Sequence, residues 1–321
     1  MLKIGGLRFR QQLPEVYGQK RLFKGYNNTI GIGILPVSSF CSGHTYFIQR
    51  MPQRRGIEPY SVHTTFQYSG AVGKTHRLRE GMLWEDEPEY YAPKENLLSY
   101  TPVVRRELIK PSGKMDVKSH FELVHSQLVQ LRAAFILARK LKRLLILPEL
   151  VCGLDRFWAP HNGTIPGSDT MLPVDPCPAD HVVDLEQMAR QHKGTVEGIL
   201  REASFLKNPR LPASVRASRR ELPPPADLAP STLAELSTSP MEAVRVLHFT
   251  SLGDLYATLP PAERESEQRK MNTWTSIWCC STPLGPKKPG HIWYDFFWDV
   301  VPHTNRHQKL VTAPWEPNFG P

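Results

Sequence analysis

The stretch from Val62 to Trp84 contains residue types that bind a metal-bridged diphosphate. His63 closes an apolar run, a glycine-containing loop follows, and Lys74 and Arg77 come next. A neutral imidazole is a passable ligand for Mn²⁺ or Mg²⁺, and the two basic side chains would offset phosphate charge. A structural histidine followed by a solvated basic loop gives the same pattern, and the spacing alone favours that interpretation.

Other motifs for phosphate or metal chemistry are incomplete or missing. Gly73-Lys74-Thr75 looks like the end of a P-loop, but the position five residues before Gly73, which requires glycine, is Tyr68. The dinucleotide-binding glycine pattern, H-E-x-x-H and G-x-S-x-G are absent. The five cysteines show no C-x-x-C spacing, so a structural zinc site is not expected. Buried thiols and secretory disulfides both remain open.

Hydrophobic periodicity predicts a mixed α/β fold. Between residues 116 and 142, apolar side chains recur in alternating steps of four and three, which places them on one face of a helix. Leu144–Leu147 follows as a buried strand. A long helix that leads directly into a short apolar strand is typical of proteins in which helices pack on a mostly parallel sheet. Shorter strands are expected over 30–37, 46–48 and 62–68.

Composition divides the chain into four segments. Residues 1–112 carry the basic diphosphate-type motif, and residues 113–200 contain the helix–strand pair. Seven prolines lie between residues 209 and 240, so residues 201–241 are expected to be a linker or a long loop. Residues 242–321 form an aromatic-rich segment with five of the seven tryptophans.

The charge balance favours an anionic partner. The 321 residues carry 40 Lys and Arg against 31 Asp and Glu, for a formal net charge of +9. Residues 1–60 hold nine basic and two acidic side chains, so most of the excess lies near the N-terminus. A nucleotide diphosphate, a nucleic acid or an acidic membrane each suits such a field. No uncharged apolar run reaches the ~18 residues of a transmembrane helix, and no signal-peptide pattern is readable.

Several longer motifs resemble one known family. They are Leu35–Val37, Phe40–Phe47, Val62–Trp84, Pro88–Tyr91, Ser119–Phe121, Gln127–Ala134, Leu147–Pro148, Cys152–Arg156 and Cys177–Val182. Through these motifs the sequence resembles the plant and algal nucleotide-diphospho-sugar transferases of glycosyltransferase family 77. The specific resemblance is to the extensin arabinosyltransferases, which act on hydroxyproline-linked arabinose.

The resemblance implies that the first segment is the C-terminal part of a GT-A-like transferase domain. His63 matches a metal-ligand histidine, and Lys74 matches a basic residue that touches the donor diphosphate. His44, Gln67 and Arg77 fall in motifs of the same donor site. The family implies a retaining transfer of a pentose from a UDP-sugar to a hydroxyproline-rich glycoprotein, with Mn²⁺ or Mg²⁺ as cofactor, in the Golgi lumen. No nucleophile or general base is identified.

Two other regions have alternative interpretations under this resemblance. Asp155 and the Asp180-His181 pair suit an acceptor site or, equally, salt-bridged loop anchors. Cys152 comes shortly before Asp155 and Cys177 shortly before Asp180, and the two cysteines are candidates for a disulfide in a lumenal protein. The aromatic run at 291–299 is either a platform that stacks on sugar or peptide rings, or the filling of a small terminal core.

One departure from the family pattern concerns the donor site. Transferases of this type carry a D-x-D motif that holds the cation and the donor, and no Asp-x-Asp occurs in the sequence. We therefore expect the donor-binding first half, and the membrane anchor before it, to be missing from this chain. A non-catalytic or sugar-binding fragment is then the nearest alternative function. A nucleic-acid-binding protein is a distant one, because no RNP, zinc-finger or basic-helix signature accompanies the basic N-terminus.

Overall fold

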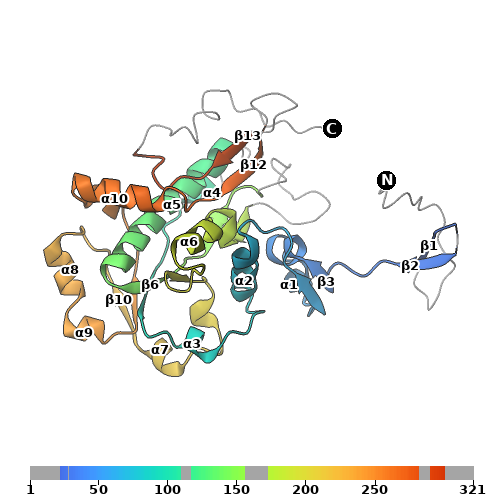
Figure 1. Ribbon diagram of the computed structural model, residues 1–321, viewed down its shortest axis with the longest axis horizontal. Helices are drawn as coiled ribbons and strands as arrows, with labels where there is room; N and C mark the ends of the chain where they lie inside the picture. The colour runs from blue at the N-terminus through green and yellow to red at the C-terminus, as the bar shows by residue number, and fades with distance from the viewer. Residues whose placement is uncertain (1–21, 28, 110–116, 156–172, 282–289, 301–321) are drawn as a thin grey trace.

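A parallel sheet of five strands lies at the centre of the computed structural model, which describes residues 22–27, 29–109, 117–155, 173–281 and 290–300 (Figure 1). The strand order is β10-β11-β5-β6-β9, and every neighbouring pair runs parallel. The strands are β5 (Asn96–Tyr100), β6 (Arg143–Ile146), β9 (Leu200–Arg201), β10 (Arg219–Leu222) and β11 (Val246–Phe249). The predicted α/β class is therefore confirmed.

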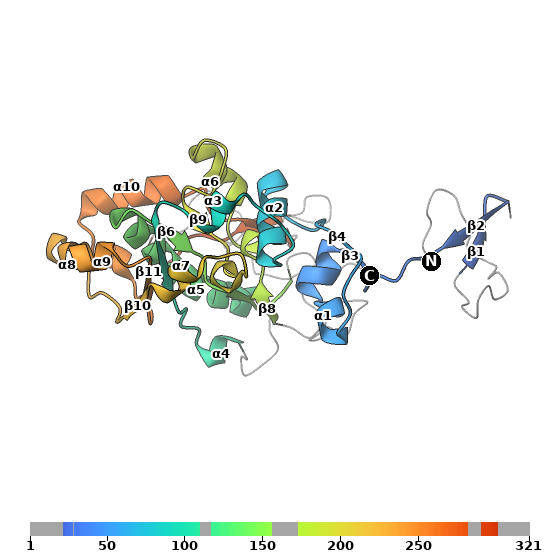
Figure 2. The same cartoon turned by 90° about the horizontal axis from the view of Figure 1, so that it is seen from below.

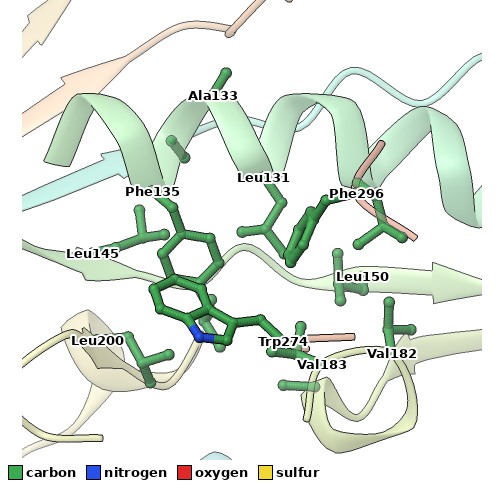
Figure 3. Close-up of a cluster of buried hydrophobic side chains, with 14 of the residues drawn as sticks. Leu131, Ala133, Phe135, Leu145, Leu150, Val182, Val183, Leu200, Trp274 and Phe296 are labelled. Atoms are coloured by element: carbon green, nitrogen blue, oxygen red, sulfur yellow. The ribbon is translucent and has the colours of Figure 1, made fainter. Parts of the chain in front are cut away.

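Helix α5 (Val117–Lys140) covers one face of the sheet, as the apolar periodicity predicts. Its Phe135 belongs to the same buried cluster as Leu145 of β6. Figure 3 shows that Trp274 and Phe296, which come from the C-terminal part of the chain, complete this cluster. Burial of these large rings stabilises the packing of α5 on this side of the sheet.

The opposite face of the sheet is covered by short elements. They are α3 (Pro88–Tyr91), η3 (Phe205–Lys207) and α7 (Ala213–Ala217). Because successive side chains of a strand point to opposite faces, Leu97 and Leu144 pack on this side while Leu98 and Leu145 pack toward α5. The sheet is thus buried on both faces, as parallel sheets generally are.

The remaining strands form two-stranded sheets outside the central one. Three pairs are antiparallel: β1 (Leu22–Gly25) with β2 (Ile30–Gly33), β7 (Leu150–Cys152) with β8 (Val174–Cys177), and β12 (Ile277–Ser281) with β13 (Gly290–Trp293). One pair is parallel: β3 (Phe40–Ser42) with β4 (Ser61–His63). The other helices are η1 (His44–Ile48), α1 (Met51–Arg55), α2 (Gly70–Glu80), α4 (Arg106–Ile109), η2 (Ala179–His181), α6 (Leu185–Gln191), α8 (Pro230–Leu236), α9 (Ser239–Glu242), η4 (Leu255–Thr258) and α10 (Pro261–Met271). Figure 2 shows that β1 and β2 stand apart from the body of the structure. Within the ranges described above, no helix is long and apolar enough to cross a membrane.

Residues 201–241, expected to be a linker or long loop, are folded instead. They form α7, α8 and α9 as well as β10, the edge strand of the central sheet. Pro212 immediately precedes α7, Pro230 is the first residue of α8, and Pro240 lies in the first turn of α9. Proline is favoured at these positions because the first helical N–H groups have no partner within the helix. Three of the seven prolines in this region therefore mark helix starts.

The central sheet also takes strands from each of the four predicted segments. β5 comes from residues 1–112, β6 from 113–200, β10 from 201–241 and β11 from 242–321. These segments consequently share one core, and the predicted boundaries cross it.

The short strands expected near the N-terminus are only partly present. β2 lies within the expected 30–37 range, and β4 overlaps only the start of 62–68. The prediction of a strand over 46–48 is wrong, because these residues belong to the π-helix η1. Three adjacent apolar residues fit either period, so sequence alone does not separate helix from strand here.

The aromatic run near the C-terminus is buried. Tyr294, Phe296 and Phe297 are 1%, 1% and 2% exposed, which excludes these three rings from an open binding platform. One correction applies, because these rings join the principal core and do not form a small core of their own. Arg132 of α5 fixes the run by donating a hydrogen bond to the carbonyl oxygen of Phe296 at 2.6 Å.

Candidate functional site

His63 and Lys74 lie on neighbouring elements, and both side chains are exposed. His63 ends β4, where it pairs in register with Ser42 of β3. Lys74 lies in the second turn of α2. The loop between them turns at Phe66, which adopts a positive φ of 63°. Both side chains are therefore accessible to a ligand from solvent.

Gln67 has a local role at the start of α2. Its Oε1 accepts a hydrogen bond from the backbone N–H of Ser69 at 3.0 Å, and Asp180 Oδ2 accepts one from the backbone N–H of Tyr68 at 2.9 Å. A Cβ atom on Gly73 would lie 2.8 Å from both Gln67 Oε1 and Ser69 Cβ, so a larger residue would require this helix start to shift. Near this helix start, where an anion could otherwise bind, the backbone N–H groups of Tyr68 and Ser69 thus donate to side-chain oxygens of the protein itself.

Arg77 is fully buried. Its guanidinium forms a short ion pair with Asp180, donates to the carbonyl oxygen of Phe66 at 2.9 Å, and donates to His181 Nδ1 at 3.1 Å. It also lies over the ring of Phe47, 5.5 Å from the ring centroid. A direct contact between Arg77 and a diphosphate would require this ion pair to open.

His44 is held in the same buried network by Asp155. The His44 Nε2–H donates to Asp155 Oδ2 at 2.9 Å, and His181 Nε2 lies 3.4 Å from Asp155 Oδ1. The His44 Nδ1 accepts from the side-chain amide of Gln49 at 3.0 Å. His44 and Arg77 are therefore brought together through Asp155, His181 and Asp180, which matches the loop-anchor interpretation of these acids.

Both buried acids are ionised. Burial alone would raise their pKa values, but hydrogen bonds from His181 and His44 outweigh it and hold the pKa of Asp155 well below its usual range. At Asp180 the charge of Arg77 outweighs burial in the same way and lowers the pKa. The network thus contains two buried carboxylates whose oxygens accept hydrogen bonds from internal partners.

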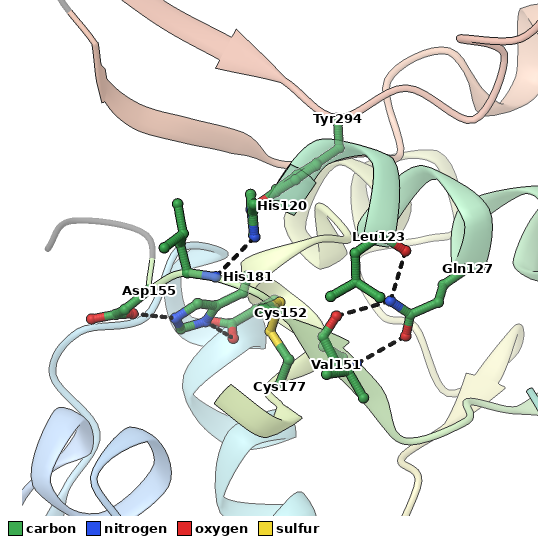
Figure 4. The surroundings of a disulfide bond; sticks show 12 residues. His120, Leu123, Gln127, Val151, Cys152, Asp155, Cys177, His181 and Tyr294 are labelled. Atoms are coloured by element: carbon green, nitrogen blue, oxygen red, sulfur yellow. Dashed lines mark hydrogen bonds and ion pairs between the residues drawn. A yellow bond between two sulfur atoms is a disulfide. The ribbon is translucent and has the colours of Figure 1, made fainter. Parts of the chain in front are cut away.

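Cys152 of β7 and Cys177 of β8 form a disulfide, with the Cα atoms 5.5 Å apart (Figure 4). This is the pair singled out in the sequence. Figure 4 also shows His120 of α5 near the disulfide and next to Tyr294. His120 Nδ1 accepts from the backbone N–H of Leu154 at 3.0 Å, and its Nε2 lies 2.8 Å from the Tyr294 hydroxyl.

A complete metal site is not formed by the part of the chain that the structure describes. In those residues no group of three or more His, Cys, Asp and Glu side chains could hold a metal ion. His63 supplies one candidate ligand, whereas Mn²⁺ and Mg²⁺ prefer several oxygen ligands. Among the described residues, His63 would therefore be one ligand of an otherwise incomplete site.

Glu80, in the last turn of α2, is a candidate site residue that the sequence did not reveal. Its Oε1 accepts from the backbone N–H of Ala179 at 2.9 Å and lies 3.6 Å from His76 Nε2. Burial raises the pKa of Glu80 to about 8, so the carboxyl is protonated at neutral pH. The helical spacing of His76 and Glu80 is visible in the sequence, but the burial that raises the pKa of Glu80 is not.

This raised pKa makes stability fall at neutral to mildly alkaline pH. Between its ordinary pKa and its raised value of about 8, the folded protein still holds the Glu80 proton that the unfolded chain has lost, so the Glu80 contribution to stability decreases as pH rises from 6.5 to 8. Burial lowers the pKa of His76 and of His120, and these groups act in the opposite direction while the histidines of the unfolded chain lose their protons. We expect Glu80→Gln to remove about 2 kcal/mol of this decrease.

Urea denaturation at several pH values, followed by circular dichroism, checks this expectation. Glu202 also has a pKa raised by burial, so the comparison is the difference between wild type and variant, which isolates Glu80. Parallel pH profiles for the two proteins would contradict it.

Comparison with known proteins identifies one relative. No family model and no solved structure matches the chain. The sequence is 40% identical over 319 residues to arabinosyltransferase XEG113 of Arabidopsis thaliana, an alignment that covers 91% of this chain and 49% of that protein. The chain thus spans about half the length of the curated relative it matches. This similarity supports the resemblance found in the sequence: over about half of that protein's length, the chain is similar to a plant arabinosyltransferase.

Proposed function

We propose that this chain is part of a retaining glycosyltransferase that moves arabinose from a UDP-sugar to an arabinosylated hydroxyproline-rich glycoprotein. The observation that carries the proposal is the 40% identity, over 91% of the chain, to an arabinosyltransferase. The disulfide supports an oxidising compartment such as the Golgi lumen. The same identity favours a transferase over a nucleic-acid-binding protein.

His63 and Lys74 are the proposed contacts to the donor. Their exposure supports this assignment, because a ligand needs accessible groups, and the Lys74 ammonium would offset charge on the departing diphosphate. A bound Mn²⁺ or Mg²⁺ would add electrostatic stabilisation of that leaving group, with His63 as one ligand. Gln67, Arg77 and His44 then act by holding the loop that presents these two side chains.

A non-catalytic fragment is the second candidate, and the missing D-x-D motif favours it. The two candidates differ in what they bind. A donor site predicts UDP binding that strengthens with MnCl₂, whereas the fragment predicts neither.

Isothermal calorimetry of UDP with and without MnCl₂ tests the donor assignment. We expect His63→Ala and Lys74→Ala each to weaken UDP binding at least about tenfold, which corresponds to one lost charge-assisted contact. Lys94→Ala, which removes an exposed lysine on another surface, should bind like wild type. If folded wild-type protein binds no UDP, the fragment interpretation holds. Transfer of arabinose from UDP-arabinofuranose to an arabinosylated hydroxyproline peptide, followed by mass spectrometry, tests the activity itself.

A further inference from the structure

A cavity of about 260 Å³ lies where β6 and β9 end. Pro148 and Glu149 follow β6, and Ala203 and Ser204 follow β9, and all four residues line it. The other walls come from η1, α1, the end of α2 and the end of β8. In open parallel α/β sheets, ligands bind beyond the carboxyl ends of the strands, which is where this cavity lies.

Two aromatic rings form one wall of the cavity. Tyr46 and Phe47 meet edge to face, with ring centroids 4.8 Å apart at 67°. Phe47 packs against the guanidinium of Arg77 and against Gly81, which also lines the cavity and where a Cβ atom would lie 3.0 Å from the ring. A rigid ring held in this way offers a flat apolar surface at low entropic cost.

The polar groups of the cavity suit a neutral ligand. Glu80 is protonated at neutral pH, so its carboxyl can donate a hydrogen bond. At the rim, Glu149 is paired with Lys207 at 2.6 Å, and Arg50 is exposed. Apart from these rim groups the lining side chains are uncharged at neutral pH, so the walls suit a neutral ligand better than a diphosphate. Flat apolar walls beside neutral hydrogen-bonding groups match a ligand with both C–H faces and hydroxyls.

We propose that this cavity binds a neutral saccharide, with a C–H face of the sugar against Tyr46 and Phe47 and a sugar hydroxyl accepting a hydrogen bond from the Glu80 carboxyl. The choice of sugar rests on the proposed function: an arabinose unit of the acceptor glycan occupies the cavity. The cavity is separate from the exposed His63 and Lys74 side chains, which do not line it.

Titration of the folded protein with arabinobiose, observed by saturation-transfer NMR and calorimetry without nucleotide, tests the proposal. Wild type should bind the disaccharide. Glu80→Gln, which keeps a neutral donor of the same shape, should bind within about threefold of wild type, whereas Glu80→Leu and Tyr46→Ala should each weaken binding about tenfold. Tyr60→Ala, which removes a ring that is 85% exposed and does not line the cavity, is the control.

Circular dichroism and melting temperature establish that each variant is folded. Two variants are used because Glu80→Leu also leaves the N–H of Ala179 without its acceptor. Absence of arabinobiose binding by wild type, or unchanged affinity in both Glu80→Leu and Tyr46→Ala, overturns the proposal. Since no UDP is present, a chain that binds arabinobiose but not UDP refutes the donor assignment alone, and the converse result refutes only the saccharide cavity.

Discussion

Asp180→Ala is expected to lower the free energy of unfolding by about 3–5 kcal/mol, the typical loss when one partner of a buried ion pair is removed. Asp180 and Arg77 are each 1% exposed, and the pair has no contact with bulk water. The alanine variant leaves the Arg77 guanidinium buried without its carboxylate, and it also removes the acceptor of the Tyr68 N–H. Urea denaturation at pH 6.5 measures the change.

A matched surface pair provides the control for this variant. Arg190 and Glu186 form an ion pair within α6, with side chains 64% and 43% exposed. We expect Arg190→Ala to change stability by less than about 1 kcal/mol, because solvent screens exposed pairs. If both variants lost a similar free energy of unfolding, the contribution of Asp180 to stability would not depend on its burial.

A double variant separates the charge effect from simple loss of packing. Arg77→Met with Asp180→Leu removes both charges and keeps apolar volume, so it should recover a substantial part of the stability lost in Asp180→Ala. If the double variant is less stable than the single one, the hydrogen bonds of Arg77 to Phe66 and His181 stabilise the loop more than the ion pair does.

The sequence predicts the parts of the fold that depend on local periodicity. Helix α5 and strand β6 appear within a few residues of their expected limits, because a long amphipathic stripe and a short apolar run have distinct periods. The order of the sheet was not predictable, since it depends on the long-range pairing of β5 with both β6 and β11. The sequence also does not reveal that residues 201–241 are folded. Prolines are common both in linkers and at helix starts, so their number alone does not separate the two.

The candidate site divides in the same way. Residue type and spacing identify His63, Lys74 and Arg77 as basic groups of one motif, but they do not show which of them are accessible. Tertiary contacts bury Arg77 against Asp180, 103 positions away, and leave Lys74 in solvent. Glu80 was missed because an acid at the end of a helix is ordinary in sequence, and its burial next to Ala179 arises only on folding.

Removing the disulfide is expected to lower the free energy of unfolding by about 3 kcal/mol. Cys152 and Cys177 are separated by 25 positions, and cross-linking a loop of that length restricts the unfolded chain by about this amount in the chain-entropy model. Both residues are buried, so the double variant Cys152→Ala with Cys177→Ala avoids placing new hydroxyls in the core. Denaturation with and without reductant measures the effect.

Reductant should destabilise the wild type and leave the double-alanine variant unchanged, while Cys41→Ala, at a buried free thiol, should keep the sensitivity to reductant. Equal denaturation midpoints for oxidised and reduced wild type would contradict the expected contribution.

Loss of the disulfide should also change the cavity, because Cys177 lines it next to Pro176 and Pro178. When β8 is no longer tied to β7, that wall is held only by its strand pairing and nearby packing. Reduced wild-type protein should therefore bind arabinobiose more weakly than oxidised protein under conditions where both remain folded.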